Sequence, residues 1–267
     1  NAFWSAMYPA HPYGRQPTVE SIASLERADL EGFYRANYSA RRAVVTIVGD
    51  VSRKQAEAIA QQLTASLPSG SPMAAPETAS LPVASEQRIA HSAAQAHLMI
   101  GVPALKRGDP DFFPLIVGNY SLGSGGFVSR LMKEVRDKRG LAYGVQSYFM
   151  PMVQPGPFQI GLQTKKAQAN EALQVVREVL AGFLADGPNE EELQAAKQNL
   201  VGSFPLRLDS NQKILDNVAA IGFFGLPLDY LDHYAENVEK VTAAQIKTAF
   251  ARHVRPENMV SVIVGGE

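Results

Sequence analysis

Residues 25–50, LERADLEGFYRANYSARRAVVTIVGD, align without gaps on residues 241–266, VTAAQIKTAFARHVRPENMVSVIVGG, at an offset of 216 residues. Each segment combines a helical pattern, a short turn and an apolar run that ends at a glycine. Identical residues occupy five of the aligned positions, namely Ala28/Ala244, Val44/Val260, Ile47/Ile263, Val48/Val264 and Gly49/Gly265. A helix–turn–strand unit that returns once at domain spacing predicts a duplicated domain. The alternative is a chance likeness between two ordinary helix–strand endings.

A duplication divides the chain into three parts. Residues 1–66 would be the C-terminal part of a first copy, and residues 86–267 would be a nearly complete second copy. Residues 67–85 contain four prolines among small side chains, a composition typical of a linker. The chain starts without an initiator methionine and without the basic and apolar regions of a signal peptide. We therefore expect an internal cut in a longer protein, with roughly 150 residues of the first copy preceding Asn1.

The hydrophobic pattern and the Pro/Gly breaks predict alternating helices and strands. Helices are expected over residues 18–37, 52–66, 110–121 and 127–139, with further helices from 167 onward that include 242–253. Strands are expected over residues 43–48, 95–102, 141–150, 158–164 and 259–264. The run at 43–48 is almost entirely apolar, which predicts a buried strand.

The composition excludes several kinds of protein. The chain has 267 residues, 46% hydrophobic and 19% charged, and a net charge of −1 with acids and bases interspersed. No basic face is evident, which argues against a nucleic-acid partner. Cysteine is absent, so disulfides and thiolate metal sites are impossible. No apolar run approaches the roughly 20 residues that a membrane span requires.

The sequence offers no zinc site of its own. Two helical zinc ligands need a spacing of three or four residues so that both face one ion. The five histidines are never that close, and they are His11, His91, His97, His233 and His253. The glycine-rich stretch Gly123–Gly126 lacks the Lys-Ser/Thr pair of a phosphate-binding loop and favours a tight turn between helices.

The most informative stretch for function is residues 122–145, LGSGGFVSRLMKEVRDKRGLAYGV. An amphipathic helix with a basic last turn ends at Gly140, and a strand follows from Leu141. Arg136 and Tyr143 are seven residues apart across this break. A guanidinium at a helix end and a phenol at a strand start could converge as two hydrogen-bond donors on a peptide carbonyl or on a developing oxyanion. The alternative is a solvated arginine and a half-buried tyrosine.

This stretch resembles the C-terminal-domain signature of the insulinase/pitrilysin family of zinc metallopeptidases, G-G-x-x-S-R-L-x-x-x-x-R-x-x-x-G-L-x-Y. The matching residues are Gly125, Gly126, Ser129, Arg130, Leu131, Arg136, Gly140, Leu141 and Tyr143. Further segments also resemble the family, among them His11-Pro12-Tyr13-Gly14, Ile47-Val48-Gly49-Asp50 and Glu191-Glu192-Leu193. The resemblance covers essentially the whole chain.

The resemblance implies an α+β fold with duplicated mixed-sheet domains of the mitochondrial-processing-peptidase-like type. It also implies that one domain binds zinc through an inverted H-x-x-E-H motif, while another supplies an Arg/Tyr pair that holds the substrate backbone. Arg136 and Tyr143 have the spacing of that pair. In this family the peptide is commonly captured as an added strand on a sheet edge.

Several expectations follow from the resemblance. The chain holds no cofactor, and zinc is expected in a missing domain or in a partner subunit, as a homodimer or heterodimer. Alone, the chain should bind a peptide without cleaving it. A periplasmic location in a bacterium is favoured. The main alternative is a non-proteolytic structural or assembly subunit of the same fold, and another is an unrelated ligand-binding α+β domain.

Overall fold

The computed structural model describes residues 1–72, 74 and 76–265. Residues 73 and 75 of the predicted linker, and residues 266–267 at the end of the predicted second copy, lie outside this description. The chain forms two compact units. Unit 1 contains Asn1–Gln16, Glu77–Gly202 and His233–Glu267, and unit 2 contains Pro17–Pro76 and Ser203–Asp232.

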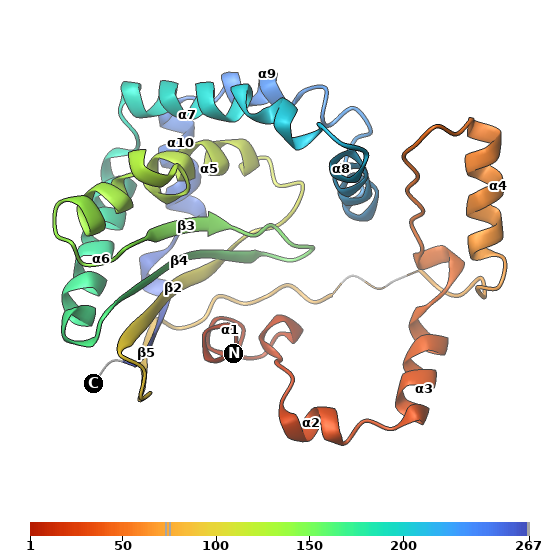
Figure 1. Cartoon of the computed structure of the whole chain (residues 1–267), viewed down its shortest axis with the longest axis horizontal. Coiled ribbons are helices and arrows are strands. Elements are labelled where there is room, and N and C mark those ends of the chain that lie inside the picture. The colour runs from red at the N-terminus through yellow and green to blue at the C-terminus, as the bar shows by residue number, and fades with distance from the viewer. Residues whose placement is uncertain (73, 75, 266–267) are drawn as a thin grey trace. The chain divides into compact units, whose positions relative to one another are not determined.

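A mixed sheet of five strands, in the order β1-β5-β2-β4-β3, is the framework of unit 1 within the described residues (Figure 1). The strands are β1 (Ser85–Ile89), β2 (Gln95–Leu105), β3 (Val145–Phe149), β4 (Gly156–Lys165) and β5 (Val260–Val264). β1 runs parallel to β5, and the other neighbouring pairs are antiparallel. The predicted α+β class is confirmed.

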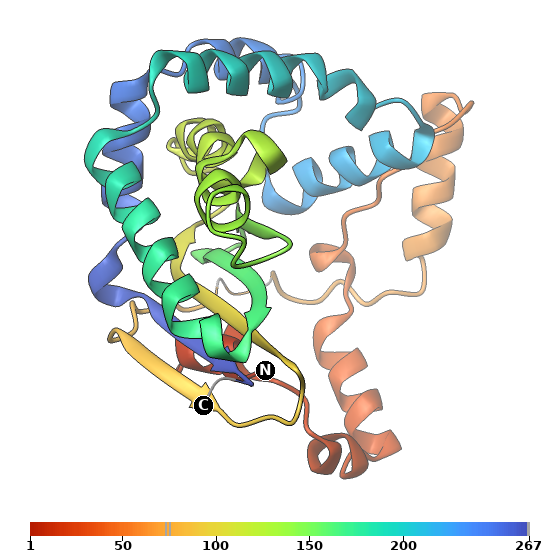
Figure 2. The same ribbon diagram turned by 60° about the vertical axis from the view of Figure 1, so that its left-hand side comes forward.

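Helices cover one face of this sheet (Figures 1 and 2). α5 (Phe112–Asn119), α6 (Ala169–Asp186) and α10 (Ala243–His253) lie against the strands, and α7 (Glu190–Gly202) and α9 (Tyr234–Glu239) pack on the outer side of α5. Alternate residues of β2 and β4 point toward these helices, so that Val102 and Phe158 are fully buried. Phe250 of α10 packs edge-on against Phe183 of α6, with ring centres 4.9 Å apart. The main core therefore lies between the sheet and the helices.

The opposite face of the sheet is partly covered by α1 (Ala2–Met7), as Figures 1 and 2 show. Phe3, Met7 and Tyr8 pack against Val260 and Val262 of β5. The Tyr8 hydroxyl donates to the carbonyl oxygen of Pro155 at 2.9 Å, which joins the N-terminal segment to the β3–β4 hairpin. Burial raises the pKa of the Tyr8 phenol far above its ordinary value.

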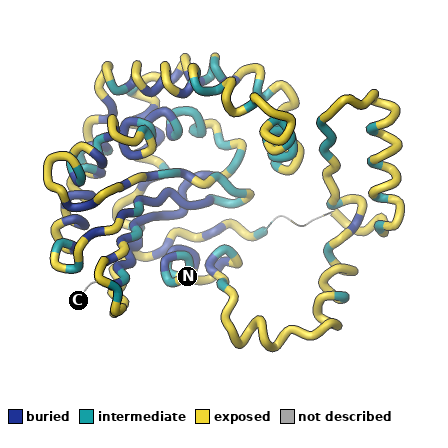
Figure 3. Tube along the Cα trace, viewed as in Figure 1, coloured by how far each residue is buried: buried dark blue, intermediate teal, exposed yellow. Residues whose placement is uncertain are grey.

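Unit 2 has little interior. It contains α2 (Val19–Ala23), α3 (Arg27–Asn37), α4 (Arg53–Thr64) and α8 (Asn211–Phe224). α2, α3 and α4 bury none of their residues, as the exposed and half-buried colouring in Figure 3 shows. None of the helices in the described residues is long and apolar enough to cross a membrane.

Several predicted elements differ in the structure. The helix predicted over residues 18–37 is interrupted after Ala23, because Glu26 and Asp29 form a capping box that starts α3 anew. The prediction of a buried strand over residues 43–48 is wrong. The segment forms no β-ladder with other described residues, and Val44 is 54% exposed. A strand needs neighbours for its main-chain groups, and unit 2 supplies none within the described residues.

The helix–turn–strand segments found in the sequence have matching boundaries in the structure. α3 and α10 begin and end at residues 216 apart, as do the short 3₁₀ turns Ala40–Arg42 and Pro256–Asn258 that follow them. Each helix starts with a capping box. The extended segment at 44–48 then corresponds to β5.

Candidate functional site

Residues 122–145, which include Arg136 and Tyr143, contain parts of two wide, π-helical turns. α5 continues into a π-helical turn over Tyr120–Ser124, and a second π-helical turn spans Met132–Asp137. In the second turn the N–H of Lys138 donates to the carbonyl oxygen of Lys133, five residues earlier, at 3.0 Å. This geometry buries Val135 and leaves Arg136 at the surface. The predicted continuous helix over 127–139 is therefore only partly α-helical.

Arg136 and Tyr143, the residues predicted to form the site, lie together. The guanidinium carbon of Arg136 is 5.6 Å from the centre of the Tyr143 ring and 4.7 Å from the centre of the Phe127 ring. Both rings are exposed, and Tyr143 is 92% exposed. The contact is a cation–π stack, with Phe127 as a third member that the sequence pattern did not predict.

Both polar groups of the pair are open to a ligand. The Arg136 guanidinium donates from Nη1 to Asp137 at 3.2 Å, and Nε and Nη2 have no hydrogen-bond partner among the described residues. Within the same residues the Tyr143 hydroxyl is also without a partner. Three donor atoms, Arg136 Nε and Nη2 and the Tyr143 hydroxyl oxygen, are thus available at one point of the surface, an arrangement that suits carbonyl or carboxylate oxygens.

The segment from Leu141 to Gly144 is irregular, although the sequence predicted a strand from Leu141. The N–H of Leu141 donates to the carbonyl oxygen of Val135, and the Thr164 hydroxyl donates to the carbonyl oxygen of Leu141 at 2.6 Å. These bonds replace the pairing of a sheet ladder, so β3 begins only at Val145. Tyr143 consequently projects from a fixed loop beside the strand.

A groove of about 730 Å³ opens beside Tyr143. Its floor is the face of the sheet that points away from the helices, and the side chains there are Gln95, His97, Met99, Gln146, Tyr148 and Gln163. Phe127, Tyr143 and the glycine-rich turn line one side. The floor carries amides, one imidazole and one phenol, and burial raises the pKa of the Tyr148 phenol. Such a surface can form hydrogen bonds to an extended peptide.

The edge of β3 next to the groove is already occupied. The Asn119 side-chain amide donates to the carbonyl oxygen of Ser147 at 2.9 Å, and the Ser147 hydroxyl donates to Asn119 Oδ1 at 2.6 Å. The N–H of Val145 points to the sulfur of Met132 at 3.4 Å. An added strand at this edge would have to displace both side chains. The open sheet face is therefore the better surface for a ligand.

A half-buried ion pair joins the segment that carries the site to the helical layer. Arg130 donates from Nε and Nη2 to both carboxylate oxygens of Glu192, at 2.8 and 2.7 Å, and from Nη2 to the carbonyl oxygen of Gly187. Burial opposes the charged form of Glu192, but the hydrogen bonds from Arg130 and from the Asn189 N–H outweigh it and lower the pKa of Glu192. Asn189 and Glu192 also form a reciprocal capping box at the start of α7.

One group of potential metal ligands lies elsewhere in unit 1. Asp109, Asp111 and His253 bring ligand atoms within 4.8 Å of one another. Sequence spacing did not predict this group, because His253 is more than 140 residues from the aspartates. Asp111 already accepts from His253 Nε2 at 3.0 Å and from Arg252 at 2.6 Å. We assign these residues a structural role, since they tie the end of α10 to the start of α5.

Comparisons with known proteins identify the family. The description "peptidase M16 inactive domain" matches residues 24–200, about two thirds of the chain. The crystal structure of a peptidase M16 inactive domain from Pseudomonas fluorescens superposes with a TM-score of 0.95 and 39% identity, covering 100% of this chain and 64% of that one. An uncharacterized zinc protease of Mycobacterium leprae is 27% identical over 98% of this chain and 60% of its own length.

A third relative has a different name. The non-peptidase homolog YmxG of Helicobacter pylori is 28% identical over 94% of this chain and 58% of its own length. The chain thus spans about 60% of the length of the curated relatives it matches. The sequence resemblance, the mixed sheet and the extent of the family match agree: the chain belongs to the insulinase/pitrilysin family of zinc metallopeptidases and carries its inactive, metallopeptidase-like domain.

Proposed function

We propose that this chain is the substrate-binding, zinc-free portion of a zinc metalloendopeptidase-type subunit. Arg136 and Tyr143 hold the backbone of an extended peptide, while a zinc-bearing domain or partner subunit cleaves it. The observation that carries this proposal is the stack of the half-buried Arg136 on the exposed Tyr143 beside the groove, with donors open to a ligand. A tyrosine that is 92% exposed and stacked on an arginine contributes little to folding.

The proposal includes a domain arrangement. Residues 1–66 form the C-terminal part of a first peptidase-like domain, 67–85 link the copies, and 86–267 form the second, zinc-free domain. The matching boundaries of α3 and α10 support this duplication. So does the contrast between aligned positions: Ile246 and Phe250 are fully buried, whereas Leu30 and Tyr34 are 61% and 50% exposed. The first copy thus offers a core face that further chain would cover.

In this proposal the zinc ion is bound by the separate zinc-bearing domain or by a partner subunit, and not by this chain. It would supply a Lewis acid and an activated water. The residues of this chain position the peptide by hydrogen bonds to its carbonyl oxygens, and they do not activate the nucleophile. The chain alone is accordingly expected to bind peptides without turnover.

Two substitutions test the role of the pair. Arg136→Ala removes a charged donor and is expected to weaken peptide binding by about 10- to 100-fold, whereas Tyr143→Phe keeps the stack and removes one neutral donor, for a loss of about 2- to 10-fold. Binding is measured with a fluorescent peptide and the chain, and turnover with the complete assembly. Lys54→Ala, on the exposed surface of α4, is the control. Unchanged affinity and turnover in both site variants would overturn the proposal.

A non-proteolytic assembly subunit is the second candidate, and the relative named as a non-peptidase homolog favours it. Such a subunit would use the same surface to hold another protein. The two functions separate in the complete assembly. If variants at Arg136 and Tyr143 remain assembled but lose turnover, the peptidase role is supported. If they disassemble, and the particles that remain assembled keep their normal turnover, the structural role is supported.

A further inference from the structure

The outer edge of β1 is distinct from the peptide groove, which lies over β2, β3 and β4. All five residues of β1 are exposed. The N–H of Ser85 donates to the carbonyl oxygen of Met259, and the carbonyl oxygen of Ile89 accepts from the N–H of Gly265. In a parallel pair the main-chain groups of alternate residues turn to the same side. Glu86 and Arg88 therefore turn their N–H and C=O groups outward, away from β5.

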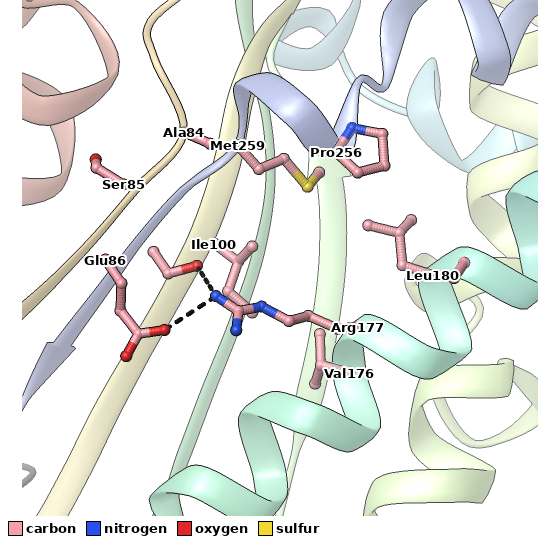
Figure 4. Close-up of a pocket in the computed structure, with 11 residues that line it drawn as sticks. Ala84, Ser85, Glu86, Ile100, Val176, Arg177, Leu180, Pro256 and Met259 are labelled. Atoms are coloured by element: carbon pink, nitrogen blue, oxygen red, sulfur yellow. Dashed lines mark hydrogen bonds and ion pairs between the residues drawn. The ribbon is translucent and has the colours of Figure 1, made fainter.

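The side chains of Glu86 and Arg88 stand on the helix face of the sheet. Glu86 accepts from Arg88 Nη2 at 2.7 Å and from Arg177 Nη2 of α6 at 3.1 Å, and Arg177 also donates to the Ser261 hydroxyl (Figure 4). These bonds hold an acid and a base on one face at alternate positions of the edge strand.

The helical layer leaves room beside this edge. A cavity of about 480 Å³ lies between α6 and the strands β1 and β5, and its apolar lining includes Ile100, Val176, Leu180 and Met259 (Figure 4). α6 packs against β2 and β4, and it reaches β1 through the side chains of Arg177, which donates to Glu86, and Asn170, which accepts from Arg88 Nη2 at 2.7 Å. In unit 1, therefore, no described helix lies over the outer side of β1.

We propose that β1 pairs with β1 of a second copy of this chain, antiparallel and about a two-fold axis at Gln87. The two sheets then join into one sheet of ten strands. Glu86 lies opposite the partner's Arg88, and Arg88 lies opposite the partner's Glu86. Each interface thus contains two identical cross-strand ion pairs beside the main-chain hydrogen bonds, as a self-complementary isologous contact requires.

Charge selects this register over its neighbours. Outward-facing residues must lie opposite outward-facing residues, so the two-fold axis can fall at Glu86, Gln87 or Arg88. An axis at Glu86 places that residue opposite the partner's Glu86, and an axis at Arg88 places two arginines opposite each other. Like charges directly opposite one another destabilise a sheet. Only the axis at Gln87 pairs acid with base.

Charge-swapped variants of the full 267-residue chain test the proposal by analytical ultracentrifugation. Glu86→Arg and Arg88→Glu each place like charges across the axis and should weaken dimerisation by roughly tenfold or more. An equimolar mixture of these two variants restores both opposite-charge pairs and should dimerise as a heterodimer. The double variant Glu86→Arg/Arg88→Glu should recover the homodimer. A structural defect in either variant cannot produce this rescue on mixing.

Controls separate the interface from folding. Glu239→Arg makes the same charge change on α9, in the helical layer, and should dimerise like the unaltered chain. Circular dichroism checks that each variant is folded. The proposal fails if the unaltered chain is a monomer at about 100 µM, or if both single variants dimerise normally. In the dimer, the main-chain amides of Glu86 and Arg88 should be protected from hydrogen exchange. The proposal also fails if these amides are unprotected in the chain alone and become protected only when an unrelated extended peptide is added.

Discussion

The Phe127 ring centre lies 4.7 Å from the guanidinium carbon of Arg136, although the Phe127 side chain is itself 65% exposed. Because an exposed cation–π contact contributes about 0.5–1 kcal/mol, Phe127→Leu should weaken peptide binding about 2- to 5-fold. The midpoint of thermal unfolding should stay nearly unchanged. Titration calorimetry with one peptide and differential scanning calorimetry give the two values. Val128→Ala, the neighbouring exposed residue, should leave both unchanged; an equal loss of binding there would refute a specific role for the Phe127 ring.

The Arg130–Glu192 ion pair should make the stability depend on pH. The pKa of Glu192 is lower in the folded chain than its ordinary value of about 4.5, so protonation favours unfolding. This stabilisation is fully present above that ordinary value and is lost as the pH falls through the lower folded value. Near neutral pH, Glu192→Gln should lower the free energy of unfolding by about 2 kcal/mol, because Arg130 loses a charged partner.

Urea denaturation at a series of pH values measures this effect. The Glu192→Gln chain should show a smaller loss of stability than the unaltered chain as the solution is acidified. Glu190→Gln changes an exposed glutamate in the first turn of the same helix and should shift stability by less than about 0.5 kcal/mol. Parallel pH profiles for the unaltered and Glu192→Gln chains would rule out Glu192 as the titrating group.

Gly123 is required by close packing. A Cβ atom there would lie 2.3 Å from the Ser147 hydroxyl and 2.8 Å from the Ser147 main-chain nitrogen. Since the backbone of β3 cannot withdraw easily, Gly123→Ala should destabilise the chain by about 1–3 kcal/mol and narrow the groove. Gly182→Ala, within α6, meets no atom within 4 Å and should stabilise the chain by about 0.5–1 kcal/mol. Chemical denaturation compares the two; equal effects would contradict this packing argument.

The duplicated arrangement makes a prediction about aligned positions. Phe250→Ala removes a fully buried ring and should cost about 3–5 kcal/mol, whereas Tyr34→Ala in this chain should cost less than about 0.5 kcal/mol. In a longer chain that contains the remainder of the first domain, Tyr34→Ala should become costly as well. Chemical denaturation of the Tyr34→Ala variant in the 267-residue chain and in the longer chain measures the two changes in the free energy of unfolding. A small effect of Tyr34→Ala in the longer chain would count against a core role for α3.

Sequence patterns predicted the elements whose signals are local. α10 follows from Thr242 and its apolar face, and β5 from an apolar run that only Ser261 interrupts. The strand β1 was not predicted, because SEQRI lies at an edge, is exposed throughout and carries no apolar alternation. The run at 43–48 has the same apolar signal as β5 but no neighbouring strand among the described residues. The hydrophobic pattern of a segment indicates only a preference for extended structure. Whether a strand forms depends on hydrogen bonding to a neighbouring strand.

The site was predictable only in part for a related reason. Arg136 and Tyr143 are close in sequence, so the resemblance could name both, and the structure brings them together. The Arg130–Glu192 and Asp111–His253 pairs join residues 62 and 142 positions apart. No spacing rule identifies such pairs, because the folded sheet and helices bring them together. The π-helical turns likewise depend on how Val135 and Met132 pack, which a 3.6-residue period does not show.

The strand order β1-β5-β2 has a consequence for how this protein is made. β1 pairs with β5 alone among the described strands, and β5 follows β1 by about 170 residues in the chain. A growing chain on the ribosome can pair β2 with β4 and β4 with β3 before β5 emerges, but β1 must wait until about 170 further residues have emerged. Until then the apolar side chains of α1 that pack against β5, such as Phe3 and Met7, remain in contact with water. The sheet is thus completed only after β5 has emerged, and nascent chains should depend on chaperones in the interval.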